Sequence, residues 1–159
     1  RLNGHKVIMK GNHDYWWNSM AKMNRFLEEN GFDTITIVHN NYYPYGEYGI
    51  CGTRGWIKDT EEPADAKVLA REAGRLEASI KAALADGKKP IVFLHYPPIF
   101  ANDYNREILD VLFRYDIKTC YYGHLHGNAH RYAVCGEVDG INYQLIAGDF
   151  VQFCPKLIM

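Results

Sequence analysis

The sequence lacks any apolar run near the roughly 20 residues that span a bilayer, and Arg1-Leu2-Asn3-Gly4-His5 has no signal-peptide pattern. We therefore expect a cytoplasmic protein without a membrane partner. It also lacks an excess of charge, because 18 Lys and Arg residues face 19 Asp and Glu residues, giving a net charge of -1. Without a basic face there is no strong signal for nucleic-acid binding.

Cysteine is sparse, and its spacing excludes two classes of protein. Cys51, Cys120, Cys135 and Cys154 are far apart, and none belongs to a CxxC pair. This pattern does not fit a disulfide scaffold or a thiolate metal site. We expect reduced, mostly buried thiols, which suits the cytosol.

What is present is the composition of one globular domain. The 159 residues are 47% hydrophobic and 23% charged, without a repeat, a low-complexity tract or a linker. We predict a single domain over residues 1–159. The first residue is Arg1 rather than Met, which we interpret as the sign of a processed or cut product, so the domain would be partial.

Hydrophobic periodicity predicts an alternation of strands and helices. Apolar residues at three- and four-residue spacing indicate helices over 15–30, 66–85 and 106–115. Short apolar, β-branched or aromatic runs indicate strands at 6–10, 34–38, 41–45, 48–52, 90–94 and 117–122, then a hairpin of 131–135 and 142–147 around Val138-Asp139-Gly140, and an edge strand at 153–159. This order predicts an α/β sandwich with two sheets.

Three of the predicted strands end in a turn with polar side chains. These turns are Gly11-Asn12-His13-Asp14, His95-Tyr96-Pro97-Pro98 and Gly123-His124-Leu125-His126. Ligands of open α/β sheets bind beyond the carboxyl ends of strands, so the three turns could form one pocket. Imidazole nitrogens with amide or carboxylate oxygens suit a hydrolytic metal centre.

Each turn alone has a plainer interpretation. A single histidine in a turn is more often a hydrogen-bonded surface group than a ligand. Asp14 or Asn12 could simply cap the helix that follows. Three strand ends with ligand-type residues are harder to explain in this way, and the combination favours a metal site.

The three turns, in this order, resemble the last three of the five signature motifs of the calcineurin-like metallophosphoesterases. The resemblance extends from about Lys6 to Phe150, and Gly52-Thr53-Arg54-Gly55-Trp56 is also similar to a segment of a bacterial group of predicted phosphohydrolases. It implies an α/β/β/α sandwich of two mixed sheets and metal-dependent hydrolysis of a phosphomonoester or phosphodiester. The implied substrate is a small-molecule or nucleotide-type phosphoester.

The resemblance also implies roles for individual residues. Asn12, His95 and His124 would bind one metal ion, and His126 would bind the other. The ions would be Mn, Fe, Zn or Ni, about 3.5–4 Å apart, and would clamp the phosphoryl oxygens and supply a hydroxide for in-line attack.

The catalytic roles implied by the resemblance belong to two neighbours in the first turn. His13 would contact the phosphate and protonate the leaving oxygen, and Asp14 would orient and charge its imidazole. Arg54 is a further candidate for phosphate binding. We interpret His5 and His39 as surface groups.

The first two motifs of the family, Asp-x-His and Gly-Asp-x-x-Asp, do not occur in the sequence, and Asp149 comes too late to belong to either. We therefore expect sheets that are truncated on the N-terminal side, at most one bound ion and weak or no turnover. An exposed sheet edge would be covered by a second copy or by rearrangement. The alternatives are a catalytically inactive metal-binding module and a module that binds a nucleotide without cleaving it.

Overall fold

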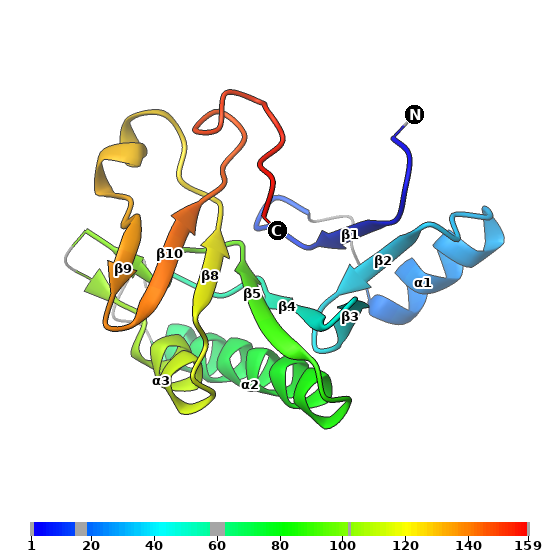
Figure 1. Cartoon of the computed structure of the whole chain (residues 1–159), viewed down its shortest axis with the longest axis horizontal. Coiled ribbons are helices and arrows are strands. Elements are labelled where there is room, and N and C mark those ends of the chain that lie inside the picture. Colours follow the sequence, from blue (N-terminus) through cyan, green and yellow to red (C-terminus); the bar gives the residue numbers. More distant parts are fainter. Residues whose placement is uncertain (1, 15–18, 58–62, 102, 159) are drawn as a thin grey trace.

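The structure is a computed structural model that describes residues 2–14, 19–57, 63–101 and 103–158. Its centre is a six-stranded mixed sheet in the order β3-β4-β5-β8-β10-β9 (Figure 1). The four inner strands are parallel, and the two outer strands run antiparallel to their neighbours. The bounds are β3 Tyr42–Tyr45, β4 Tyr48–Thr53, β5 Lys89–Leu94, β8 Thr119–Tyr122, β9 Gly136–Val138 and β10 Ile141–Leu145.

Two helices cover one face of this sheet, α2 (Pro63–Ala85) and α3 (Arg106–Arg114) (Figure 1). Asn105 begins α3, because its side chain accepts a hydrogen bond from the N–H of Ile108 at 3.1 Å. Between helices and sheet lies the core, whose fully buried members include Leu76, Ile80, Val92, Leu112 and Tyr143. No described helix is long and apolar enough to cross a membrane.

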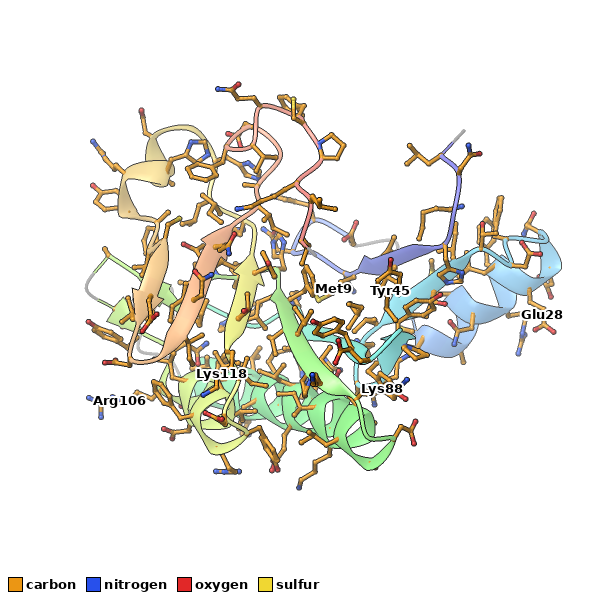
Figure 2. All side chains as sticks on the ribbon, in the orientation of Figure 1. Met9, Glu28, Tyr45, Lys88, Arg106 and Lys118 are labelled. Atoms are coloured by element: carbon orange, nitrogen blue, oxygen red, sulfur yellow. The ribbon has the colours of Figure 1, made fainter. Side chains whose placement is uncertain are left out.

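A smaller unit lies against the six-stranded sheet. It consists of β1 (Lys6–Met9) and β2 (Ile35–Val38), which pair in parallel, and of the helix α1 (Met20–Glu29), which comes between them in the sequence (Figure 1). Met9 marks the contact with the large sheet (Figure 2), since a Cβ added to Gly52 of β4 would lie 3.2 Å from its sulfur. β1 therefore delivers the turn at residues 11–14 to the large sheet.

Most predicted elements are present within two or three residues of their predicted bounds, but two predictions at the C-terminal side are wrong. The hairpin begins at Gly136 rather than at residue 131, because residues 127–132 form a 3-10 helix. Residues 153–158 contain no strand, since Gln152 and Phe153 have positive φ angles of 54° and 55° and turn the chain. A short hairpin of β6 (Ile99–Phe100) and β7 (Asp103–Tyr104) was not predicted.

The predicted helix over 15–30 is described from Met20 onward, and residues 15–18 lie outside the described part of the chain. Its cap is Ser19, whose hydroxyl accepts a hydrogen bond from the N–H of Lys22 at 3.3 Å. Neither Asn12 nor Asp14 serves as this cap. Both side chains therefore remain available for other roles.

One buried tyrosine gives a test of the core. Tyr143 is fully buried, and its hydroxyl has no hydrogen-bond partner among the described residues, whereas Tyr122 donates to the carbonyl of Val134 at 2.7 Å. An unsatisfied buried hydroxyl costs free energy. We expect Tyr143→Phe to raise the free energy of unfolding by about 1 kcal/mol and the matched control Tyr122→Phe to lower it by about 1 kcal/mol, as measured by urea denaturation. Equal destabilisation by both variants would show that the Tyr143 hydroxyl is satisfied in solution.

Candidate metal centre

Parallel pairing brings two of the polar turns to one edge of the large sheet. β5 and β8 are neighbours, with Leu94 opposite Tyr122. Their next residues, His95 and Gly123, therefore leave the sheet side by side, and the Gly123 N–H lies 3.2 Å from the carbonyl oxygens of Leu94 and His95. The turn after β1 reaches the same place, because Asn12 contacts His95.

Three ligand-type atoms meet there. Asn12 Oδ1 lies 2.7 Å from His95 Nε2, and His124 Nδ1 lies 3.2 Å from the same nitrogen. Two nitrogens that bind one ion each lie about 2.0–2.1 Å from it. With a nitrogen–metal–nitrogen angle of about 90–109°, the two nitrogens are about 2.8–3.4 Å apart. The spacing of His95 and His124 is in this range, so the two rings could share one ion after a small adjustment of Asn12.

The close approach depends on two features of the backbone. A Cβ at Gly11 would lie 3.2 Å from His95 Cε1 and 3.3 Å from Asp14 Oδ2, so a glycine leaves room for both side chains. His124 has a φ of 67°, in the left-handed region that costs energy for a residue with a side chain. Such strain is typical of a functional site, and here it turns the imidazole toward His95.

The electrostatic environment keeps His95 neutral. Burial lowers the pKa of His95 to about 4, and the nearby charges of His124 and Arg54 act in the same direction. At neutral pH the ring therefore carries one proton, so one of its nitrogens has a free lone pair. A neutral imidazole is the form that binds metal ions.

His126 points to a different partner. Its Nδ1 lies 2.9 Å from Asp149 Oδ1, and the other carboxylate oxygen accepts the N–H of Gly127 at 2.9 Å. His130 Nε2 lies 3.2 Å from Asp149 Oδ2, within ion-pair range but without hydrogen-bond geometry. The Gly127 N–H and His126 hold the pKa of Asp149 below its usual range. The carboxylate is therefore ionised and leaves Nε2 of His126 as the nitrogen open to a metal ion.

Asp149 was not among the site residues predicted from the sequence, although a signal for it exists. It follows the carboxyl end of β10, a parallel neighbour of β8, and so obeys the same strand-end rule as the three turns. It belongs to none of the motifs that the three turns resemble.

We expect Asp149→Ala to change the tautomer of His126. Without the carboxylate, the proton should move from Nδ1 to Nε2, the nitrogen that would face a metal ion. Nitrogen-15 NMR of the imidazole reads the tautomer directly. Asp103→Ala, at an exposed aspartate outside this cluster, is the control. An unchanged His126 tautomer in Asp149→Ala would refute the positioning role.

The other predicted residues supply none of the three donor atoms that meet. His13 is exposed at the tip of the turn. The hydrogen bond described for Asp14 comes from the Gly11 N–H at 2.6 Å, so its pairing with His13 stays a prediction. Arg54 lies beyond Tyr96, with its guanidinium 4.8 Å from the centre of the Trp56 ring. His5 is exposed and hydrogen-bonded to Thr36.

The three donor atoms that meet here belong to two imidazoles and one amide. Within the described parts of the chain, no group of three or more His, Cys, Asp or Glu side chains is arranged to hold a metal ion. Two imidazoles and one amide fit the nitrogen and oxygen preference of Zn, Mn, Fe and Ni, but they bring no negative charge. The donors present thus fit part of one coordination shell.

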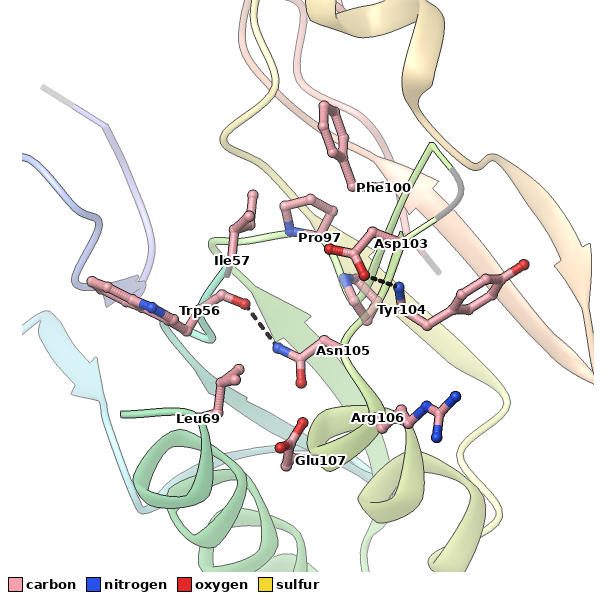
Figure 3. A pocket seen from close by; sticks show the side chains of 11 residues that line it. Trp56, Ile57, Leu69, Pro97, Phe100, Asp103, Tyr104, Asn105, Arg106 and Glu107 are labelled. Carbon is pink, nitrogen blue, oxygen red and sulfur yellow. Dashed lines mark hydrogen bonds between the residues drawn. The ribbon is translucent and has the colours of Figure 1, made fainter. Parts of the chain in front are cut away.

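A pocket of about 230 Å³ lies beside Pro97 (Figure 3). It is lined by Pro97, Pro98 and residues of α3, and Asn105 closes one wall by donating to the carbonyl of Trp56 at 2.8 Å. None of Asn12, His95, His124 and His126 lines it. The pocket is therefore separate from the candidate metal centre.

The chain was compared with curated proteins, solved structures and protein families. No curated protein and no solved structure matches the chain. A family model does match, over residues 1–128, and its description is calcineurin-like phosphoesterase. The matched segment contains all three polar turns and most of the large sheet. Because it covers well over half of the sequence, the chain belongs to the calcineurin-like phosphoesterase family.

Proposed function

We propose that this protein is a metal-dependent phosphoester hydrolase in which Asn12, His95 and His124 hold one divalent ion. The observation that carries the proposal is the meeting of Asn12 Oδ1, His95 Nε2 and His124 Nδ1 within 2.7 and 3.2 Å contacts, from three separate strand ends. Family membership implies phosphoester hydrolysis.

Hydrogen bonding alone accounts poorly for this arrangement. The neutral ring of His95 has one proton, and Nε2 faces two acceptor-capable atoms, Asn12 Oδ1 and His124 Nδ1. A proton on Nε2 points best at only one of them. A cation between the three atoms would use all three lone pairs, which supports a metal site.

We propose that His126 belongs to a second metal position, as the family pattern implies. Asp149 supports this role, because a carboxylate on one imidazole nitrogen leaves the other as a good ligand. The Asp-x-His and Gly-Asp-x-x-Asp motifs, which would supply carboxylates to both ions, are absent from the 159 residues. The chain alone should therefore hold at most one ion, and a dinuclear centre in an α/β/β/α sandwich would need those residues as well.

The roles of the other residues follow from their positions. A bound ion would neutralise phosphoryl charge and activate water. His13, which is exposed, would approach a substrate and donate its proton to the leaving oxygen as the P–O bond breaks. Asp14, held by the Gly11 N–H, would orient that imidazole.

A second candidate function rests on the missing carboxylates. Two imidazoles and one amide could hold a single structural ion in a module that performs no hydrolysis, or line a nucleotide-binding pocket. We favour the enzyme, because a structural site needs no general acid such as His13. Turnover discriminates between the two.

The proposal is tested by a phosphoester screen of the protein with Mn²⁺, Zn²⁺, Fe²⁺ or Ni²⁺. We expect slow hydrolysis of nitrophenyl phosphate or bis-nitrophenyl phosphate that needs the added ion and stops with a chelator. Metal analysis should give no more than one ion per chain. Two tightly bound ions would contradict the ligand assignment, and metal binding without any hydrolysis would favour the inactive module.

A further inference from the structure

A second site lies beside the candidate metal centre, between the ends of β1, β2 and β4 and the first half of α2. It is a pocket of about 530 Å³, which we call the arginine pocket. Its cationic residues are Lys10, Arg54, Arg71 and Arg75, and His39 also lines it. No Asp or Glu is among the described residues that line this pocket.

The arginines have one buried partner, Glu72, whose side chain is fully buried. Arg75 Nη1 lies 2.6 Å from Glu72 Oε1, and the Thr53 hydroxyl donates to Oε2 at 2.6 Å. Arg71 and Arg54 lie farther from the same carboxylate, at 3.6 and 4.0 Å. One guanidinium and one hydroxyl therefore satisfy Glu72 without the other two arginines.

Charge counting shows an excess of positive charge. Three arginines and one glutamate give a net charge of +2. Burial first, and Arg75 next, lower the pKa of His39, so this imidazole is neutral at pH 7 and adds no charge. Repulsion between these positive charges destabilises the folded chain, and an anion bound in the pocket would reduce the repulsion.

Two backbone connections join the arginine pocket to the candidate metal centre. Lys10 immediately precedes Gly11 and Asn12, and the carbonyl of Arg54 accepts the N–H of Tyr96 at 2.8 Å. A substrate with its reacting phosphate near His95 could therefore extend toward the arginines.

We infer that the arginine pocket binds a second phosphate group of the substrate, so that the preferred substrate is a phosphoester with two phosphate groups. Guanidinium groups match phosphate geometry in two-point hydrogen bonds, and the volume admits a phosphate with part of its organic group. The substrate statement rests on the proposed hydrolase function, but phosphate binding in the pocket does not.

Inorganic phosphate is the probe, titrated calorimetrically into the full chain at low salt with a chelator present, so that no metal takes part. We expect saturable binding of one phosphate per chain. Arg71→Gln should weaken it by about tenfold, because a charge-assisted hydrogen bond is lost. Arg71 suits this test because its side chain is 53% exposed and lies farther from the Glu72 carboxylate than that of Arg75. Arg71→Lys should keep part of the affinity.

The matched control is Arg114→Gln on α3, which removes the same charge from an arginine with a 58% exposed side chain outside the pocket. It should leave phosphate affinity unchanged. No saturable binding to the wild-type chain, or equal weakening by Arg71→Gln and Arg114→Gln, would overturn the inference.

Kinetics separate this inference from the proposed function. Arg71→Gln should lower kcat/KM about tenfold for an ester with two phosphate groups and leave kcat/KM for nitrophenyl phosphate unchanged. Hydrolysis of both esters without any such difference refutes the second-phosphate site. Phosphate binding in the pocket with no hydrolysis of either ester refutes the proposed function and leaves the pocket standing as an anion site.

Discussion

His95→Ala is expected to lower the affinity of the chain for its divalent ion by at least about 100-fold. Loss of a residue that only orients a metal ligand lowers metal affinity by about 10–100-fold. His95 is itself a proposed ligand and contacts both of the other donors, so its loss should have at least the larger of these effects. Isothermal titration with Mn²⁺ or Zn²⁺ measures the change. Asn12→Ala should act in the same direction, since it removes a second donor from the same ion.

The control for this prediction is His5→Ala, which removes an exposed imidazole hydrogen-bonded to Thr36. It should leave metal affinity unchanged. Circular dichroism with a chelator present should show that all three variants are folded. Metal affinity that is the same in His95→Ala and His5→Ala would mean that the ion binds elsewhere.

In the enzyme with both metal positions occupied, His13→Ala is expected to lower turnover by about 10²–10⁴ while leaving the metal content intact, because a general acid contributes about that much. The loss should be smaller for nitrophenyl esters than for alkyl esters, since a good leaving group needs no proton. Steady-state rates on the two kinds of ester, with metal analysis of the same samples, check both parts.

Two results would contradict this role. Loss of metal in His13→Ala would make His13 a ligand, and an equal loss of rate on both kinds of ester would exclude proton donation. His5→Ala again serves as the comparison, because it removes a histidine that no step uses.

The strand ends were predictable because their signals are local. An apolar strand followed by Gly11-Asn12 or Gly123-His124 leaves little choice of structure, and the parallel pairing of β5 with β8 then fixes where the side chains go. The helices α2 and α3 follow from their apolar spacing in the same way. The meeting of the second and third turns thus needed only local rules and the order of the strands, whereas the first turn reaches them through the packing of β1 against β4.

Other features depend on contacts that the sequence does not reveal. The hydrogen bond of Asp149 to His126 joins residues 23 positions apart and needs the register of β10 against β8. The arginine pocket combines Arg54 with two arginines of α2 around Glu72, a buried carboxylate that reads in the sequence as an ordinary helix residue. The turn at Gln152 and Phe153 uses left-handed backbone at residues that do not favour it.

The central claim is that Asn12, His95 and His124 bind one ion together. The most direct measurement is an anomalous difference map from crystals of the chain soaked in Zn²⁺ or Mn²⁺. We predict one peak at about 2.0–2.2 Å from Asn12 Oδ1, His95 Nε2 and His124 Nδ1. A peak bound by other residues, or no peak among these three atoms at a saturating metal concentration, would contradict the claim.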